Sequence, residues 1–324
     1  MTHSALPFSQ EASFNNLMAD PITALWQQRH QGTLQGVNNC QLSWVSLTPG
    51  TSNKVIVIVN GRIESYYKYQ ELFFDLINQG YHIYSLDHRG QGMSQRLTVD
   101  PEMGYVDQFD DYVTDLHTFI TDIVKPQGYQ HHFLLGHSMG GAISSLLLAR
   151  HPKLIDRAVL SAPMHGIYLK PSLRFFAEPL ARFNDYIHRQ PTYAPGQRSY
   201  YPKPFANNPL THSDIRFQWT KTLYQQQPQL RLGGASNRWV WQSLAGARAS
   251  VLEAKNIITP TLILQGSADH IVDNQAHHHF CQRTPNCSQL VTIADARHEL
   301  LFEKDQYRNI ALTEICNHFA ASEQ

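Results

Sequence analysis

The sequence has few cysteines and no long apolar run, and these two shortages exclude several classes of protein. Its four cysteines, Cys40, Cys281, Cys287 and Cys316, are spread over 324 residues. They are too few and too scattered for a fold held together by disulfides. Cys281 and Cys287 are close enough in sequence to pair, but reduced cytosolic thiols are the expectation. No stretch approaches the ~18 consecutive apolar residues that a membrane-spanning helix needs.

Low-complexity tracts and internal repeats are also missing. The first twenty residues have neither a basic start nor an apolar core, so we expect no signal peptide. The 26 basic residues are balanced by 26 acidic ones, and we expect no nucleic-acid partner. The chain is long enough for one α/β domain that carries an insertion. We therefore expect a cytoplasmic protein, compatible with peripheral contact at the inner face of the cytoplasmic membrane.

Short strand patterns recur along most of the chain. The run Lys54–Val59 is continuously apolar and β-branched after its first residue, which is typical of a strand buried on both faces. Six further strands are predicted at Gln41–Leu47, Tyr81–Leu86, His132–Leu135, Arg157–Ser161, Thr261–Leu264 and Gln289–Ile293.

Helical patterns alternate with these strands. They are predicted at Pro21–Arg29, Tyr69–Gln79, Phe109–Val124, Met139–Arg150, Asn274–Arg283 and Tyr307–Phe319. Repeated strand–helix alternation indicates an α/β fold in which helices cover both faces of a doubly wound, mostly parallel sheet.

The alternation stops between residues 164 and 255. This segment has no clear strand pattern, and helices are predicted at Leu173–Arg189 and Asp214–Gln226. It contains twelve basic and only four acidic residues. We predict a core made of residues 1–163 and 256–324, with residues 164–255 forming a mainly helical, basic cap inserted before the late strands. Such a cap suits an anionic surface or a phosphate-bearing substrate, although the charges could also be spread over a solvated face.

The stretch Gly136-His137-Ser138-Met139-Gly140 lies between a predicted strand and a predicted helix. It matches Gly-x-Ser-x-Gly, in which a sharp strand-to-helix turn exposes a serine hydroxyl. Glycines at both ends let the strand and helix approach closely. The string is short enough to occur by accident, so its partners must decide whether Ser138 is a nucleophile.

The partners of such a serine follow at later strand ends. A serine hydroxyl needs a histidine base that a carboxylate orients. Asp269 follows the strand at Thr261–Leu264, and His298 follows the strand at Gln289–Ile293. Because ligands bind at the carboxyl ends of parallel strands, we predict Ser138 as nucleophile, His298 as base and Asp269 as its orienting acid. Asp273 is the alternative acid.

The oxyanion hole should consist of two backbone N–H groups. One belongs to Met139, which follows the nucleophile. The other is assigned to Arg62, in the loop Asn60-Gly61-Arg62 after an earlier strand. Only their amides are needed, so neither side chain is required by the hole.

Two other polar stretches have structural interpretations. Asp87–Ser94 is predicted to be a glycine-rich turn at a strand exit rather than a catalytic loop. His277, His278 and His279 with His270 could form a metal site, but consecutive helix positions point in different directions, which favours a solvated helix face. We therefore expect no metal and no cofactor.

These motifs together resemble the α/β-hydrolases of the monoacylglycerol lipase and bacterial lysophospholipase branch, and the bacterial members more closely. The similarity spans about Val55 to Phe319 and includes Asn60–Tyr66, Leu232–Gly234 and His298–Asp305. One departure is Asn60-Gly61, where the wider family usually has His-Gly. The resemblance implies an α/β-hydrolase fold and a membrane-associated enzyme that releases fatty acid from lysophospholipids.

The basic cap agrees with that implied substrate, or with a monoacylglycerol. Arg174, Arg182 and Arg189 are the candidate side chains for binding a phosphate headgroup. A monoacylglycerol lipase, another carboxylesterase or thioesterase, and a serine aminopeptidase are the alternatives. A non-catalytic binding protein of the same fold is a more remote one.

Overall fold

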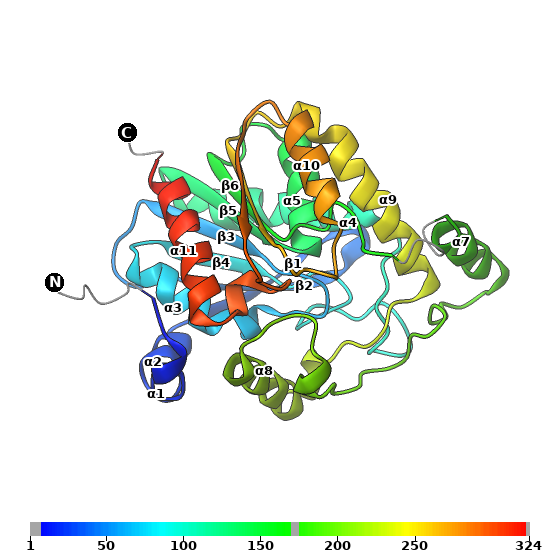
Figure 1. Cartoon of the computed structure of the whole chain (residues 1–324), viewed down its shortest axis with the longest axis horizontal. Helices are drawn as coiled ribbons and strands as arrows, with labels where there is room; N and C mark the ends of the chain where they lie inside the picture. Colours follow the sequence, from blue (N-terminus) through cyan, green and yellow to red (C-terminus); the bar gives the residue numbers. More distant parts are fainter. Residues whose placement is uncertain (1–7, 170–174, 322–324) are drawn as a thin grey trace.

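The computed structural model describes residues 8–169 and 175–321, and its centre is an eight-stranded sheet (Figure 1). The strand order is β1-β2-β4-β3-β5-β6-β7-β8. Only the pairs β1–β2 and β2–β4 are antiparallel. The strands are β1 (His30–Gln35), β2 (Gln41–Leu47), β3 (Lys54–Val59), β4 (His82–Leu86), β5 (His131–His137), β6 (Arg157–Ser161), β7 (Thr261–Gly266) and β8 (Cys287–Ile293). The predicted α/β fold with a mostly parallel sheet is confirmed.

Helices cover both faces of this sheet (Figure 1). The core helices are α1 (Phe14–Ala19), α2 (Pro21–Gln27), α3 (Gln70–Asn78), α4 (Phe109–Phe119), α5 (Met139–Arg150), α10 (Asn274–Arg283) and α11 (Asp305–Ala320). Each predicted core helix is present. The one predicted at Phe109–Val124 is α4 followed by a π-helical turn over Ile120–Val124.

Strand β3 is buried on both sides because its alternate residues enter two different cores. Val55, Val57 and Val59 pack in a cluster with residues of α4 and α5. Ile56 and Ile58 pack in a second cluster with residues of α3 and α11. Burial on both faces explains why this strand reads as a continuous apolar run. It also places the exit of β3 at the centre of the sheet.

Strand β1 was not predicted from the sequence. Its six residues, His30-Gln-Gly-Thr-Leu-Gln35, include one large apolar side chain, and none of them is buried. The strand is held by pairing with β2 at the edge of the sheet. Gly32 lies directly against the Trp44 ring of β2, leaving no room for a side chain there. Neighbour pairing, rather than its own pattern, makes this segment a strand.

The expectation of reduced thiols is wrong for one pair of cysteines. A disulfide joins Cys281, near the end of α10, to Cys287, the first residue of β8. The tight connection between α10 and β8 brings their Cα atoms to 5.3 Å, a normal separation for a disulfide. Cys40 and Cys316 are free.

The segment 164–255 contains three described helices, α7 (Ala177–Ile187), α8 (Asp214–Gln226) and α9 (Asn237–Glu253). The helix predicted at Leu173–Arg189 is α7, and α9 was not predicted. α7 and α8 lie outside the layers that enclose the sheet (Figure 1). In contrast, α9 packs on the core, where Gly246 lies against Phe109 and Gln242 Oε1 accepts the Phe109 N–H at 2.9 Å. The cap boundary at residue 255 stays a prediction. Among the described residues, no helix is long and apolar enough to cross a bilayer.

Candidate active site

Ser138 lies in the sharp turn between β5 and α5. Its φ of 52° is a backbone conformation that non-glycine residues rarely adopt. The turn is held by the Ser138 N–H, which donates to Ser161 O on β6 at 3.0 Å, and by the Met164 N–H, which donates to Ser138 O at 2.8 Å. A Cβ at Gly136 would lie 2.6 Å from Ser144 Oγ. The glycine therefore allows β5 to pass close to α5.

Ser138, His298 and Asp269 form one hydrogen-bonded chain. The Ser138 hydroxyl lies 2.9 Å from His298 Nε2, and His298 Nδ1 lies 2.7 Å from Asp269 Oδ2. A carboxylate can only accept, so Nδ1 carries the proton and Nε2 is left to accept from the serine. All three side chains are buried. This is the arrangement in which a histidine can act as a base toward a serine.

Asp269 rather than Asp273 contacts the histidine. The Asp269 carboxylate also accepts the N–H groups of Ile271 at 2.7 Å and Val272 at 3.3 Å. Although burial favours the neutral acid, these bonds and the His298 ring lower the pKa of Asp269. Asp273 instead caps α10 by accepting the Gln275 N–H at 3.0 Å.

The loop after β3 approaches the nucleophile from the other side. A Cβ at Gly61 would lie 3.2 Å from Ser138 Cβ, so this loop touches the turn that carries the serine. Arg62 is the next residue of the loop. Met139 is the first residue of α5, and amides in a first helical turn have no intrahelical acceptor. Met139 and Arg62, the two predicted donors, thus lie on segments that flank Ser138.

Sequence reasoning missed Glu64, which holds this loop in place. Its carboxylate accepts the Gly61 N–H at 2.6 Å and bonds to Lys68 Nζ at 2.7 Å. Lys68 also pairs with Glu299, the neighbour of His298, at 2.7 Å. Burial opposes ionisation of Glu64, but Lys68, His137 and the Tyr69 hydroxyl together lower its pKa to about 2. The only sequence signal was a Glu and a Lys four residues apart.

The turn at Asp87–Ser94 is structural, as predicted. Asp87 is fully buried and accepts hydrogen bonds from Asn60 Nδ2 at 3.0 Å, Ser65 Oγ at 2.6 Å and the Tyr66 N–H at 2.8 Å. Burial is the largest influence on its carboxyl and raises the pKa to about 6. Asp87 therefore ties β4 to both ends of the loop 60–66.

The segment 164–255, the predicted cap, contacts the same loop directly. Tyr224 of α8 donates its hydroxyl hydrogen to Ile63 O at 2.8 Å, and Arg62 Nη2 donates to Gly233 O at 2.9 Å. The loop 60–64 is thus held by Glu64 from within and by the cap from outside.

The candidate headgroup arginines of the cap differ in their surroundings. Arg182 is exposed, pairs with Glu178 at 2.9 Å and lies over the Trp241 ring at 4.6 Å. Arg189 is exposed and follows the end of α7. Arg174 lies outside the described residues. No described contact joins Arg182 or Arg189 to Ser138, and the part of all three arginines in substrate binding stays a prediction.

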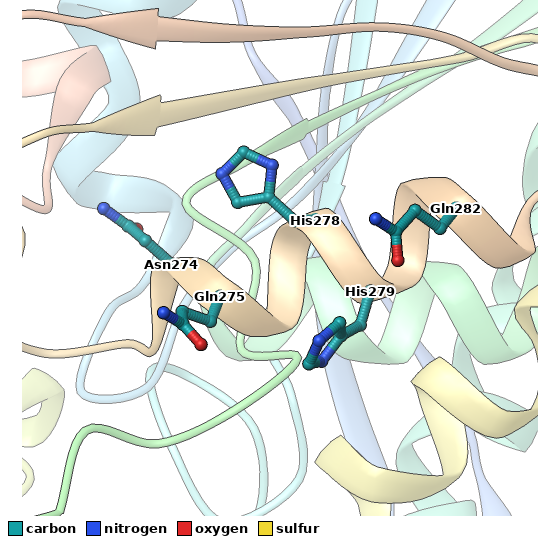
Figure 2. Close-up of a pocket in the computed structure, with 5 residues that line it drawn as sticks. All are labelled: Asn274, Gln275, His278, His279 and Gln282. Carbon is teal, nitrogen blue, oxygen red and sulfur yellow. The ribbon is translucent and has the colours of Figure 1, made fainter.

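The histidines of α10 do not form a metal cluster among the described residues. His278 and His279 project from different sides of α10 and line a surface pocket with Asn274, Gln275 and Gln282 (Figure 2). His277 is buried instead, with Nε2 at 2.7 Å from Pro163 O. The solvated-face interpretation is therefore wrong for His277. None of the residues lining this pocket belongs to the Ser138 chain of hydrogen bonds.

Comparison with known proteins gives consistent matches over most of the chain. A family model described as "Serine aminopeptidase, S33" matches residues 50–305. Lysophospholipase L2 of Escherichia coli is 38% identical, over 96% of this chain and 93% of its own. Probable lysophospholipase L2 of Haemophilus influenzae is 33% identical, over 96% of this chain and 98% of its own.

Similarity to solved structures extends to more distant proteins. A soluble variant of monoglyceride lipase from Saccharomyces cerevisiae, in complex with a substrate analog, superimposes with a TM-score of 0.69 at 17% identity. The match covers 90% of this chain and 96% of the yeast chain. At that identity the match supports the fold alone.

Proposed function

The chain belongs to the serine aminopeptidase S33 family of α/β-hydrolases, and on that premise we propose that it is a lysophospholipase, a serine hydrolase that cleaves the acyl ester of single-chain phospholipids. The observation that carries this proposal is the 38% identity over 96% of the chain to the lysophospholipase L2 of Escherichia coli. The hydrogen-bonded Ser138, His298 and Asp269 support the same chemistry.

Acyl transfer would begin at Ser138. His298 Nε2 takes the proton of the serine hydroxyl as Oγ attacks the ester carbonyl, and Asp269 stabilises the imidazolium that forms. The backbone N–H groups of Met139 and Arg62 are the proposed donors to the oxyanion. His298 then protonates the departing glycerol oxygen, and water hydrolyses the acyl-enzyme by the same route. The reaction needs neither metal nor cofactor.

The nucleophile is tested by covalent labelling. A fluorophosphonate should label the wild type at one site, and Ser138→Ala should abolish the labelling because no other activated hydroxyl is proposed. Hydrolysis of lysophospholipid should fall by about a thousandfold or more in the same variant. A wild type that is not labelled, or an unchanged label in Ser138→Ala, would refute the mechanism.

Monoacylglycerol hydrolysis is the second candidate, because the monoglyceride lipase of Rattus norvegicus is 26% identical over 82% of this chain. A lysophospholipid and a monoacylglycerol with the same acyl chain separate the two functions. The proposal requires the larger kcat/KM on the lysophospholipid.

We also propose that the protein is cytoplasmic and binds peripherally to the inner face of the cytoplasmic membrane, through α7. Four apolar side chains recur at helical spacing on and just before α7: Phe176, Leu180, Phe183 and Ile187, which are 68%, 48%, 60% and 51% exposed. Arg182 and Arg189 lie in the same segment. An apolar stripe with basic residues beside it is the pattern of a helix that lies in an anionic lipid interface.

Vesicle sedimentation tests this contact. Phe183→Ser combined with Ile187→Ser should weaken binding to phosphatidylglycerol-containing vesicles about tenfold or more, because two apolar side chains are lost from the interface. Val99→Ser is the matched control, since Val99 is 99% exposed and lies outside the cap. Equal binding by the double variant and the control would exclude α7 as the contact.

A further inference from the structure

The Arg62 side chain lies at the boundary between the core and the cap. Its Nη2 donates to Gly233 O at 2.9 Å, and its Cζ lies 4.6 Å from the centre of the Trp239 ring. A Cβ at Gly104 would lie 2.7 Å from Nη2, so the glycine leaves room for the guanidinium. The group is therefore held in a fixed place by a carbonyl, an aromatic face and a glycine.

No carboxylate balances the charge of this side chain within residues 8–169 and 175–321. Its Nε is sealed from solvent and has no hydrogen-bond acceptor there. The three arginines that are more deeply buried all have carboxylate partners: Arg89 with Asp115 at 2.6 Å, Arg216 with Glu71 at 2.8 Å and Arg308 with Asp75 at 2.6 Å. Burial lowers the pKa of Arg62 to about 10. A partly buried cation without a counter-ion is costly.

The position of this cation relates it to the reaction. Arg62 follows Gly61, which touches the turn that carries Ser138. The backbone of Arg62 is a proposed oxyanion donor, so its guanidinium is only one side chain away from the ester carbonyl. In a lysophospholipid, the glycerol unit separates the ester from the phosphate by a comparable length.

Building on the proposed lysophospholipase function, we propose that the Arg62 guanidinium binds the phosphate of the substrate headgroup and thereby selects lysophospholipids over neutral monoacylglycerols. A guanidinium suits this role because its planar set of N–H groups matches phosphate oxygens. The same residue would then serve the ester through its amide and the headgroup through its side chain.

The cap cations are weaker candidates because local carboxylates already neutralise several of them. Glu178 pairs with both Arg182 and Arg248, and Arg238 pairs with Asp185 at 2.9 Å. The number of basic residues in the cap thus exceeds the number of cations that are free to bind a headgroup.

Selectivity, measured as a ratio, tests the proposal. Every non-proline variant of Arg62 keeps the backbone donor, so Arg62→Gln removes the charge without removing the N–H. The ratio of kcat/KM for oleoyl lysophospholipid to that for monooleoylglycerol should fall about tenfold to a hundredfold, mainly through KM. Arg62→Lys should recover part of the ratio because it restores the charge. Arg283→Gln, the same change at an exposed position on α10, should leave the ratio as in the wild type.

A second readout uses an inhibitor. Glycerol 3-phosphate should inhibit hydrolysis of a short-chain ester competitively in the wild type and less in Arg62→Gln. Inorganic phosphate at the same concentration should inhibit more weakly if the site is built for a headgroup, and equal inhibition would assign it to free phosphate instead. Fluorophosphonate labelling reports whether each variant keeps an assembled nucleophile. If Arg62→Gln is not labelled, its nucleophile is not assembled. The role of Arg62 is then decided by the selectivity of Arg62→Lys and by the inhibition of the wild type.

The outcomes separate the two proposals. A wild type that prefers monooleoylglycerol overturns the lysophospholipase function and the role of Arg62 with it. A wild type that prefers lysophospholipid, with an unchanged ratio in Arg62→Gln, overturns only the role of Arg62. An equal loss on both substrates would also overturn it, because that pattern indicates a general effect on the oxyanion loop.

Discussion

The hydrogen-bond partners of Asp269 keep its carboxyl group ionised although the side chain is buried. It is buried, which would favour the neutral acid, yet two backbone N–H groups and His298 lower its pKa. Asn at this position could present its NH2 group to His298 Nδ1 and so favour the wrong tautomer. The proton would then sit on Nε2, where it blocks the acceptance of the serine hydrogen.

Asp269→Asn should therefore lower kcat by about 10³- to 10⁴-fold. Steady-state hydrolysis of a short-chain ester measures this, with circular dichroism to verify folding. Asp273→Asn is the comparison, because Asp273 caps α10 and the carboxylate bonded to His298 Nδ1 is that of Asp269. We expect it to keep kcat within about threefold and to change stability little, because Asn caps a helix about as well as Asp. The reverse order of the two losses would assign the acid to Asp273.

At the residue scale, the sequence predicted the site residues whose place follows from the order of the strands. It missed the residues whose role depends on tertiary contacts. Ser138, Asp269 and His298 each follow a predicted strand, and parallel strands bring such positions to one edge. The Lys68–Glu299 pair beside Glu64 and the contacts of the Arg62 guanidinium depend on residues from distant segments. Neither leaves a periodic signal in the sequence.

At the scale of the element, the turn between β5 and α5 depends on close contact between the helix and β3. A Cβ at Gly140 would overlap the main-chain carbonyls of Val59 and Asn60, and Asn60 leads into the loop that carries Arg62. Gly140→Ala must push the helix or this loop aside.

We expect Gly140→Ala to lose about 1–3 kcal/mol of unfolding free energy and at least about a hundredfold in kcat/KM. Urea unfolding and ester hydrolysis measure the two losses separately. Wild-type activity in this variant would show that the loop tolerates displacement, which would contradict the tight placement of the oxyanion donors.

The elements that the sequence did not predict lack a pattern of their own. β1 has no alternation because it is half-exposed and lies at an edge. α9 begins at the cap and ends against α5, so its buried residues, which include Trp239, Ser243, Gly246 and Ala247, are small or polar as often as apolar. Core strands such as β3 were predictable because burial on both faces requires a nearly continuous run of apolar residues.

For the whole molecule, buried histidines predict sensitivity to acid. Burial lowers the pKa of His88, His132, His137 and His318 to about 4. Between pH 6.5 and 4 these rings remain neutral in the folded chain but gain protons when it unfolds, so their contribution is complete above pH 6.5 and is lost as the pH falls. Asp87, whose pKa is raised to about 6, acts in the opposite direction but is one group against these four and His277, whose pKa is also lowered to about 4.

The unfolding free energy should therefore fall between pH 6.5 and pH 5, by roughly 1.4 kcal/mol per pH unit for each histidine that stays neutral, less the opposing contribution of Asp87. Urea midpoints at a series of pH values measure it. His132→Gln should make the dependence shallower by about one histidine's share. Constant or rising stability on acidification would show that these rings take up protons in the folded state.

The two hydrogen bonds that join the cap to the loop 60–64 have a consequence for recombination between relatives. Tyr224 bonds to Ile63, and Gly233 bonds to Arg62. Exchanging the segment 164–255 for that of a relative would therefore replace one partner in each hydrogen bond. A cap from a relative would contact a loop of different sequence and would lose its position relative to that loop. Chimeras should therefore retain function only when the loop and the cap are inherited from the same parent, although more than a hundred residues separate them in the chain.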